Sequence, residues 1–109
     1  MKLVTAIVQD KDATKLSNEF VKNNVRATRL ATSGGFLRAG NTTFMIAIAD
    51  ERLDDVLKLI AEHAHQRKQF MVPPVGLDTN LEGTSSYPVE VEVGGATVIV
   101  QDIEAFHQF

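Results

Sequence analysis

Apolar and polar residues follow one another early in the chain in a pattern that predicts a strand and then a helix. Residues 3–8 are nearly all apolar and rich in β-branched side chains, which is typical of a strand buried on both faces. Asp10 and Asp12 then offer N-caps for a helix, in which apolar residues recur at helical spacing from Ala13 to Phe20. We therefore expect this first helix to lie against a central strand.

The second predicted strand has a polar face. Asn24 is a predicted helix stop, because asparagine tolerates the left-handed backbone. Residues 25–32 alternate after it, so Asn24, Arg26 and Thr28 should line up on one face of a strand, opposite apolar side chains. A loop over residues 33–41 and another apolar strand over residues 42–49 follow.

The second helix has the clearest periodicity. Asp50 is its predicted N-cap, and its apolar stripe consists of Leu53, Val56, Leu57, Ile60 and Ala64. Residues 66–88 then hold all three prolines, and only residues 69–72 there have the composition of a short strand. A connection of this length indicates a functional or disordered loop. We expect its tip, residues 77–86, to be mobile without ligand.

The last segment of the chain predicts a hairpin. Residues 89–93 alternate, Gly94-Gly95 is typical of a two-residue turn, and residues 96–100 are the return strand. The aromatic tail, residues 104–109, is expected to dock. The order βαββαβ with a C-terminal hairpin predicts an α+β, ferredoxin-like domain over residues 1–109, with an antiparallel sheet and two helices on one face. The other face would stay open and favour self-association.

Composition narrows the classes of function. The 109 residues include no cysteine, which excludes thiolate nucleophiles, cysteine-based zinc sites and redox pairs. A net charge of −3 argues against binding a nucleic acid polymer. No apolar run has the length of a membrane span, and the N-terminus becomes polar too early for a signal peptide, so a cytoplasmic protein without membrane insertion is expected.

One stretch looks suited to a ligand. Residues 24–41 contain three arginines, three glycines and one aromatic residue, Phe36. Arginine donates forked hydrogen bonds to phosphate, and glycine lets backbone amides approach an anion. A phosphate-containing ligand, with a nucleobase against Phe36, is one interpretation. A solvated strand face followed by an ordinary glycine turn is the other.

The sequence offers little for catalysis. No serine has the surroundings of an activated nucleophile, and the glycines match neither the dinucleotide fingerprint nor the Walker loop. His63 and His65 are two residues apart on a helix and face away from each other, so no shared metal is predicted. His107 either lines a pocket or packs. We expect a protein that is not an enzyme and holds no metal.

Four runs of sequence carry a family resemblance. Residues 22–44, residues 7–10, residues 87–98 and the ending AFHQF resemble the PII-like cyclic di-AMP receptor proteins of Gram-positive bacteria. The similarity covers the whole chain. It implies a signal-transduction receptor for this second messenger, a homotrimer with one ligand in each of three clefts between subunits, no cofactor besides the ligand, and a downstream protein partner that the sequence does not identify.

The resemblance also implies a set of ligand contacts. These are Asn24, Arg26, Ala27, Thr28, Gly35, Phe36, Leu37, Asn41 and Gln108. Arg26 would pair with a phosphodiester, Asn24 and Thr28 would add hydrogen bonds, and Gly35 would expose its backbone amide. Phe36 and Leu37 would pack on adenine.

Two rival functions have weaker support in the sequence. Classical PII regulators, which sense ATP and ADP, carry a long loop between the second and third strands with a modified tyrosine. Here that connection is short, the only tyrosine is Tyr87, and the long loop follows the second helix. A small acylphosphatase-like enzyme could pair an arginine with an asparagine around phosphate, but its arginine loop is missing. Loop ordering on ligand binding is the expected signalling device.

Overall fold

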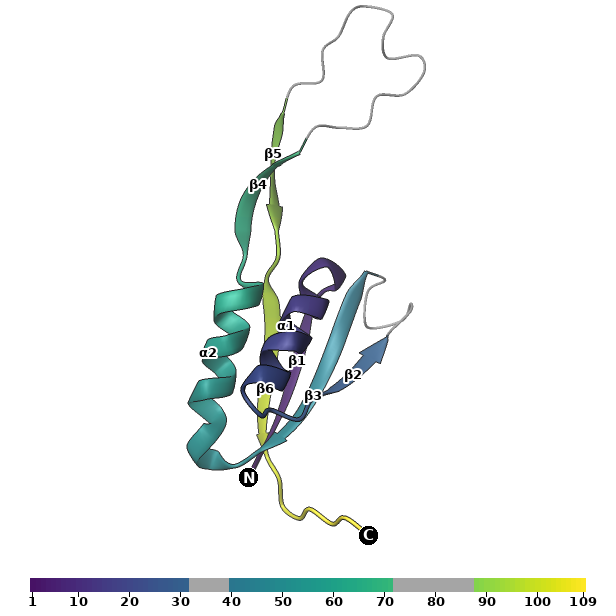
Figure 1. Ribbon diagram of the computed structural model, residues 1–109, viewed down its shortest axis with the longest axis vertical. Helices are drawn as coiled ribbons and strands as arrows, with labels where there is room; N and C mark the ends of the chain where they lie inside the picture. The colour runs from purple at the N-terminus through teal and green to yellow at the C-terminus, as the bar shows by residue number, and fades with distance from the viewer. Residues whose placement is uncertain (32–39, 72–87) are drawn as a thin grey trace, which may run out of the picture.

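The computed structural model describes residues 1–31, 40–71 and 88–109 (Figure 1). Along the chain the elements are β1 (Lys2–Gln9), α1 (Asp10–Lys22), β2 (Thr28–Ala31), β3 (Asn41–Ile48), the short 3-10 helix η1 (Asp50–Arg52), α2 (Leu53–Ala64), β4 (Arg67–Met71), β5 (Val89–Val93) and β6 (Ala96–Asp102).

The main sheet has four antiparallel strands in the order β2-β3-β1-β6. Strand β1 is central and pairs over its whole length with β3, from Lys2 opposite Ile48 to Gln9 opposite Asn41. Its other edge pairs with β6. This strand order, with two helices between the strands, confirms the predicted ferredoxin-like α+β fold.

The core lies between the sheet and the two helices. Alternate residues of β1 point into it and are buried, namely Val4, Ala6 and Val8. Phe20 of α1 meets Phe44 of β3 edge to face, with ring centroids 5.4 Å apart. The predicted apolar stripe of α2 supplies Val56, Ile60 and Ala64 as buried residues. The hydrophobic periodicity therefore identified the core faces correctly.

The opposite face of the sheet is partly exposed. Thr5 lies there between Met45 on β3 and Ile99 on β6, its partners in the two ladders. Met45 is 38% exposed and Ile99 is 47% exposed. Apolar side chains therefore reach the surface in the middle of a sheet.

The predicted C-terminal hairpin is wrong in its pairing. Strand β5 pairs with β4, and Arg67 lies opposite Val93; β6 instead joins the main sheet beside β1. The two-stranded ribbon β4-β5 extends beyond the main sheet (Figure 1). Alternation identified β5 as a strand but carried no information about its partner. The first strand of the ribbon is also placed earlier than predicted, at Arg67–Met71, and the expected loop tip lies outside the described residues.

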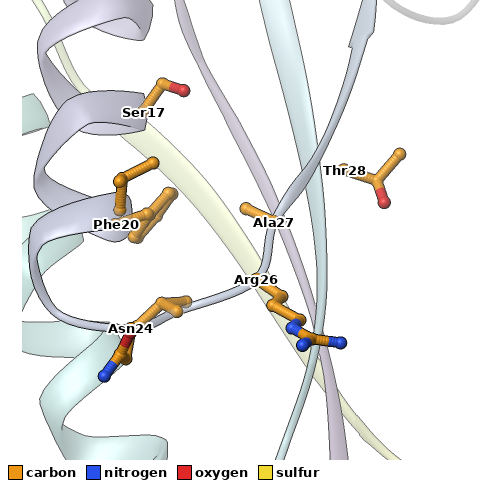
Figure 2. Close-up of a pocket in the computed structure, with 8 residues that line it drawn as sticks. Ser17, Phe20, Asn24, Arg26, Ala27 and Thr28 are labelled. Carbon is orange, nitrogen blue, oxygen red and sulfur yellow. The ribbon is translucent and has the colours of Figure 1, made fainter.

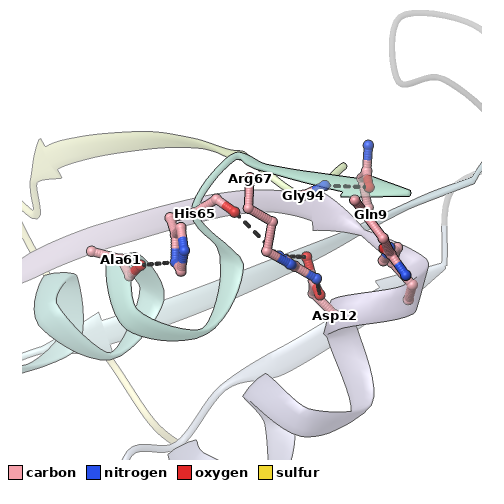
Figure 3. Close-up of polar contacts among 8 residues, drawn as sticks. Gln9, Asp12, Ala61, His65, Arg67 and Gly94 are labelled. Carbon is pink, nitrogen blue, oxygen red and sulfur yellow. Dashed lines mark hydrogen bonds and ion pairs between the residues drawn. The ribbon is translucent and has the colours of Figure 1, made fainter. Parts of the chain in front are cut away.

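Gly94 and Gly95 form the joint between the ribbon and the main sheet, not a hairpin turn. Both have positive φ, +81° and +98°. The Gly94 amide donates to Oε1 of Gln9 at 2.7 Å (Figure 3), and the Gly95 amide donates to the carbonyl of Ala64 at 2.6 Å. The glycines thus let one extended chain change direction while both amides find acceptors.

An ion pair with a buried carboxylate supports the same joint. Arg67, at the start of β4, donates to both carboxylate oxygens of Asp12 in α1, at 2.7 and 3.3 Å (Figure 3). The Asp12 side chain is only 7% exposed. The hydrogen bond that Arg67 donates to Asp12 raises the pKa of Arg67. Arg67 also donates to the carbonyl of His65 at 3.2 Å.

Three further predictions need correction. Asp10 and Asp12 lie within the first turn of α1, whose N-cap is Gln9, and Asp50 lies within η1. Acidic residues favour the first turn as well as the cap, because both positions face the positive end of the helix dipole. The strand expected over residues 25–32 begins only at Thr28, since residues 25–27 form a connection after the turn at Asn24.

The predicted docking of the aromatic tail is not seen on the part of the chain that the structure describes. Residues 104–109 form no helix or strand and leave the sheet beyond β6 (Figure 1). Phe106 is 53% exposed and Phe109 is fully exposed. Aromatic residues predict burial, but the sequence does not say on which chain. No helix in residues 1–31, 40–71 and 88–109 is both long and apolar enough to span a membrane.

We predict that Gly94→Ala destabilises the fold more than Gly95→Ala does. A Cβ at Gly94 would lie 2.5 Å from both Nη1 of Arg67 and the carbonyl oxygen of His65, whereas a Cβ at Gly95 meets only Gln66, at 3.8 Å. Both substitutions carry the strain of positive φ, about 1–3 kcal/mol, so the neighbouring variant is a matched control. Equal losses in urea-induced unfolding would contradict a steric role for the Gly94 site.

Candidate ligand-binding site

The candidate site begins where α1 ends. The amide of Asn24 donates to the carbonyl of Val21 at 3.2 Å, and the amide of Val25 donates to the carbonyl of Phe20 at 2.8 Å. With Asn24 at a φ of 58°, these two bonds form a Schellman motif, in which a left-handed residue reverses the chain at the helix end. Val25 is 4% exposed, so an apolar anchor accompanies the motif.

A groove of about 580 Å³ lies between this helix end and the residues that follow. It is lined by Ser17, Phe20, Val21, Asn24, Val25, Arg26, Ala27 and Thr28. Figure 2 shows Ser17 and Phe20 on the helix facing Ala27, while Arg26 and Thr28 extend away from the helix. Four residues that the sequence nominated, at positions 24 and 26–28, therefore share one groove.

The groove has donors at its rim and apolar surface at its wall. The side chains of Asn24, Arg26 and Thr28 are exposed. Among the residues that the structure describes, the guanidinium of Arg26 has no ion-pair or hydrogen-bond partner. A free guanidinium beside an amide and a hydroxyl is suited to an anionic oxygen of a phosphate ester. The apolar wall, including the exposed Val21, can cover the flat surface of a base.

Asn41 lies away from this groove. It starts β3 opposite Gln9 and lines a second hollow of about 740 Å³, together with the Gly94-Gly95 joint. Thr28 pairs with Met45, four residues further along β3. At about 3.3 Å per strand residue, Asn41 is thus on the order of 13 Å along the strand from the groove. A ligand that contacts both must lie along β2.

Of the remaining nominated residues, Gln108 is described and does not line the groove. Gln108 is exposed in the tail, between His107 and Phe109, whose rings stack with centroids 5.9 Å apart. Gly35, Phe36 and Leu37 lie outside the described residues. The other histidines have separate neighbours: His63 lies 3.8 Å from Glu19, and His65 Nδ1 is 3.1 Å from the carbonyl of Ala61.

Sequence reasoning missed the contribution of α1 to the groove. Ser17, Phe20 and Val21 are related by three and four residues, so they lie on one side of the helix, facing the segment that follows. The sequence held one signal, because Val21 is apolar but falls on the polar side of an otherwise amphipathic helix. In the structure it is 73% exposed. Phe20 gave no such signal, because its core position already explained it.

Comparison with known proteins places the chain among receptors. The sequence model of a family described as "Cyclic-di-AMP receptor" matches residues 1–109. A crystal structure of a functionally unknown protein from Pediococcus pentosaceus is 51% identical in sequence, with a TM-score of 0.80; the match covers 99% of this chain and 96% of that one. The fold is therefore shared across nearly the full length of both proteins.

We predict that the left-handed backbone of Asn24, and not its carboxamide, stabilises the turn at the end of α1. Asn24→Gly should leave the free energy of unfolding unchanged or raise it, because glycine adopts positive φ without strain. Asn24→Ala should lower it by about 1 kcal/mol. Urea-induced unfolding of both variants measures the difference. If Asn24→Gly proved the less stable variant, the carboxamide rather than the backbone would be holding the turn.

Proposed function

The chain belongs to the cyclic-di-AMP receptor family, and on that premise we propose a non-enzymatic receptor that binds cyclic di-AMP at the groove of residues 24–28. We propose further that each site is completed between subunits of a homotrimer. The observation that carries the proposal is the guanidinium of Arg26, which is unpaired among the described residues and exposed beside Asn24 and Thr28 on an apolar wall. This combination matches a molecule with two anionic phosphodiesters and two bases.

Each groove residue has a chemical role in this proposal. Arg26 pairs with a phosphodiester, while Asn24 and Thr28 donate further hydrogen bonds. Ala27, half-buried beside Phe20, leaves room for a ribose or base at the wall. Asn41 contacts the far end of the ligand, along β2. Gly35, Phe36 and Leu37, which lie outside the described residues, add a backbone amide and an apolar cover for adenine.

Two surfaces support assembly from several copies. The open sheet face presents Met45 and Ile99, and the tail presents Phe106 and Phe109. Large apolar side chains of this kind are typical of an interface between subunits. In the proposed homotrimer the tail of one subunit supplies Gln108 to the site of its neighbour, which agrees with its absence from the residues that line the groove of its own chain.

The proposal predicts heat on titration with cyclic di-AMP, and none with ATP or cyclic di-GMP, in isothermal calorimetry. Arg26→Ala should weaken binding by about ten- to a hundredfold, the value of a hydrogen bond to a charged group. Its stability should be unchanged, because the guanidinium has no partner among the described residues. Arg29→Ala is the matched control, because it removes an exposed arginine that does not line the groove and that lies on the face of β2 opposite Thr28.

The titration with ATP, a parallel titration with ADP and an assay for turnover of acetyl phosphate test the rival functions. Heat with ATP or ADP alone would favour a PII-type regulator, and turnover of acetyl phosphate would favour an acylphosphatase-like enzyme. Unfolding of Arg26→Ala would make Arg26 a structural residue and move the site elsewhere.

We predict that Ile99→Glu dissociates the homotrimer. The substitution places a charge on the open sheet face next to Thr5, and burying it between subunits would cost several kcal/mol per ion. Sedimentation velocity should show trimer for the wild type and monomer for the variant. Val89→Glu, on the ribbon at 46% exposure, is the control. A wild-type monomer would contradict the assembly while leaving ligand binding to be judged by calorimetry.

Signalling in this proposal uses the segments that contact the ligand and the long connection after α2. Cyclic di-AMP would order the loop that holds Gly35, Phe36 and Leu37 and the predicted tip of the long connection, residues 77–86, and a downstream protein would bind the ordered form. Hydrogen exchange with and without cyclic di-AMP tests this: protection of both segments is the expected result, and unchanged exchange would contradict it.

A further inference from the structure

Arg52, at the end of η1, reaches across to the end of α1. Its Nη2 donates to the carbonyl of Asn23 at 2.6 Å, and its Nη1 donates to the carbonyl of Asn24 at 3.0 Å. These contacts join residues that are 28 and 29 positions apart in the sequence. The two carbonyls belong to the turn from which the groove begins.

The chemistry of a helix end explains why an arginine stands there. The last carbonyls of a helix have no partner within it and carry the negative end of the dipole. The Schellman motif uses the amides of Asn24 and Val25, but the carbonyls of Asn23 and Asn24 still need donors. A guanidinium supplies two donors in fixed geometry, so a single side chain satisfies both.

Arg52 itself is not part of the groove. It lines a separate hollow on the α2 side, with Asn23 and Asp55 among its neighbours, and is absent from the residues that line the groove. Any effect of Arg52 on the ligand must therefore act through the backbone that it holds.

We propose that Arg52 is a positioning residue for the ligand site: by bonding the carbonyls of Asn23 and Asn24 it fixes the turn from which Asn24 and Arg26 project. The inference rests on the proposed function. Asn24 is exposed and has a left-handed backbone, and residues 25–27 belong to no helix or strand. The direction of this segment is therefore determined by the Schellman motif, the buried Val25 and the two hydrogen bonds from Arg52 together. Fixing them before binding spares the ligand the cost of ordering them.

The test compares four proteins by calorimetry with cyclic di-AMP: wild type, Arg52→Ala, Arg52→Lys and Lys58→Ala. If the alanine variant leaves a tenth of the molecules with a competent turn, its affinity falls about tenfold. Lysine keeps the charge at the helix end but cannot reproduce the fork, so Arg52→Lys should bind with an affinity between those of the alanine variant and the wild type. Lys58→Ala removes an exposed cation from the same region and should bind like wild type. The ammonium of Lys58 lies 4.0 Å from a carboxylate oxygen of Glu62.

A second readout separates positioning from general stabilisation. In amide NMR spectra of the ligand-free protein, Arg52→Ala should shift or broaden the signals of residues 24–28 and leave those of β1 unchanged. Uniform changes over the whole chain would overturn the inference, since they would show that Arg52 only stabilises the fold as a whole. If the alanine variant fails to fold, Arg52→Lys carries both measurements.

The outcomes also separate this inference from the proposed function. A wild type that binds cyclic di-AMP, with Arg52→Ala binding equally well, would overturn the role of Arg52 alone. A wild type that gives no heat would overturn the receptor proposal and, with it, a positioning role toward this ligand, while the spectra would still show whether Arg52 orders the turn.

Discussion

Strand β1 is the element on which the rest of the fold depends, because it forms hydrogen bonds along both edges and buries every second side chain under the helices. Its two ladders fix β3 and β6 in register, and β3 in turn holds the edge strand β2. The end of β1 also supplies Gln9, whose side chain accepts from Gly94, and leads directly into α1. The groove therefore lies at the β2 edge of the sheet, and the elements that form it are positioned by β1 through β3 and α1.

The candidate site combines rigid support with an open rim. The helix end is held by the Schellman bonds, by buried Val25 and by Arg52 from η1. The side chains at the rim carry no such restraint within the described residues, and Arg26 is free among them. This arrangement suits a binding protein, because the backbone is ordered before the ligand arrives while the donors remain available. The carboxylates of Asp10 and Asp12 lie at the opposite end of α1 and already have partners there: Asp10 accepts from Thr42 at 2.6 Å, and Asp12 is paired with Arg67.

Local patterns in the sequence were sufficient for the elements of the fold that depend on periodicity. Val4, Ala6 and Val8 alternate, and Val56, Ile60 and Ala64 repeat at helical spacing, so core faces could be read directly. Pairing partners could not, because Val89–Val93 alternates equally well against β4 or β6. The same limit applied to the site: Asn24, Arg26 and Thr28 were close in sequence and could be grouped, whereas Arg52, 28 residues from Asn24, reaches this region only through tertiary structure.

The joint at Gly94-Gly95 has a mechanical consequence. The chain of β5 continues through the two glycines into β6, so tension applied to the ribbon runs along β6 and loads its seven residue pairs with β1 in shear. Bonds loaded in this direction share the force, whereas the five residue pairs between the two strands of the ribbon can separate one after another. The Arg67–Asp12 ion pair lies at the base of the ribbon, between the strands that can separate and the sheet that is loaded in shear. The fold can therefore yield to a pull on the ribbon by opening β4 from β5, while its central sheet keeps its register.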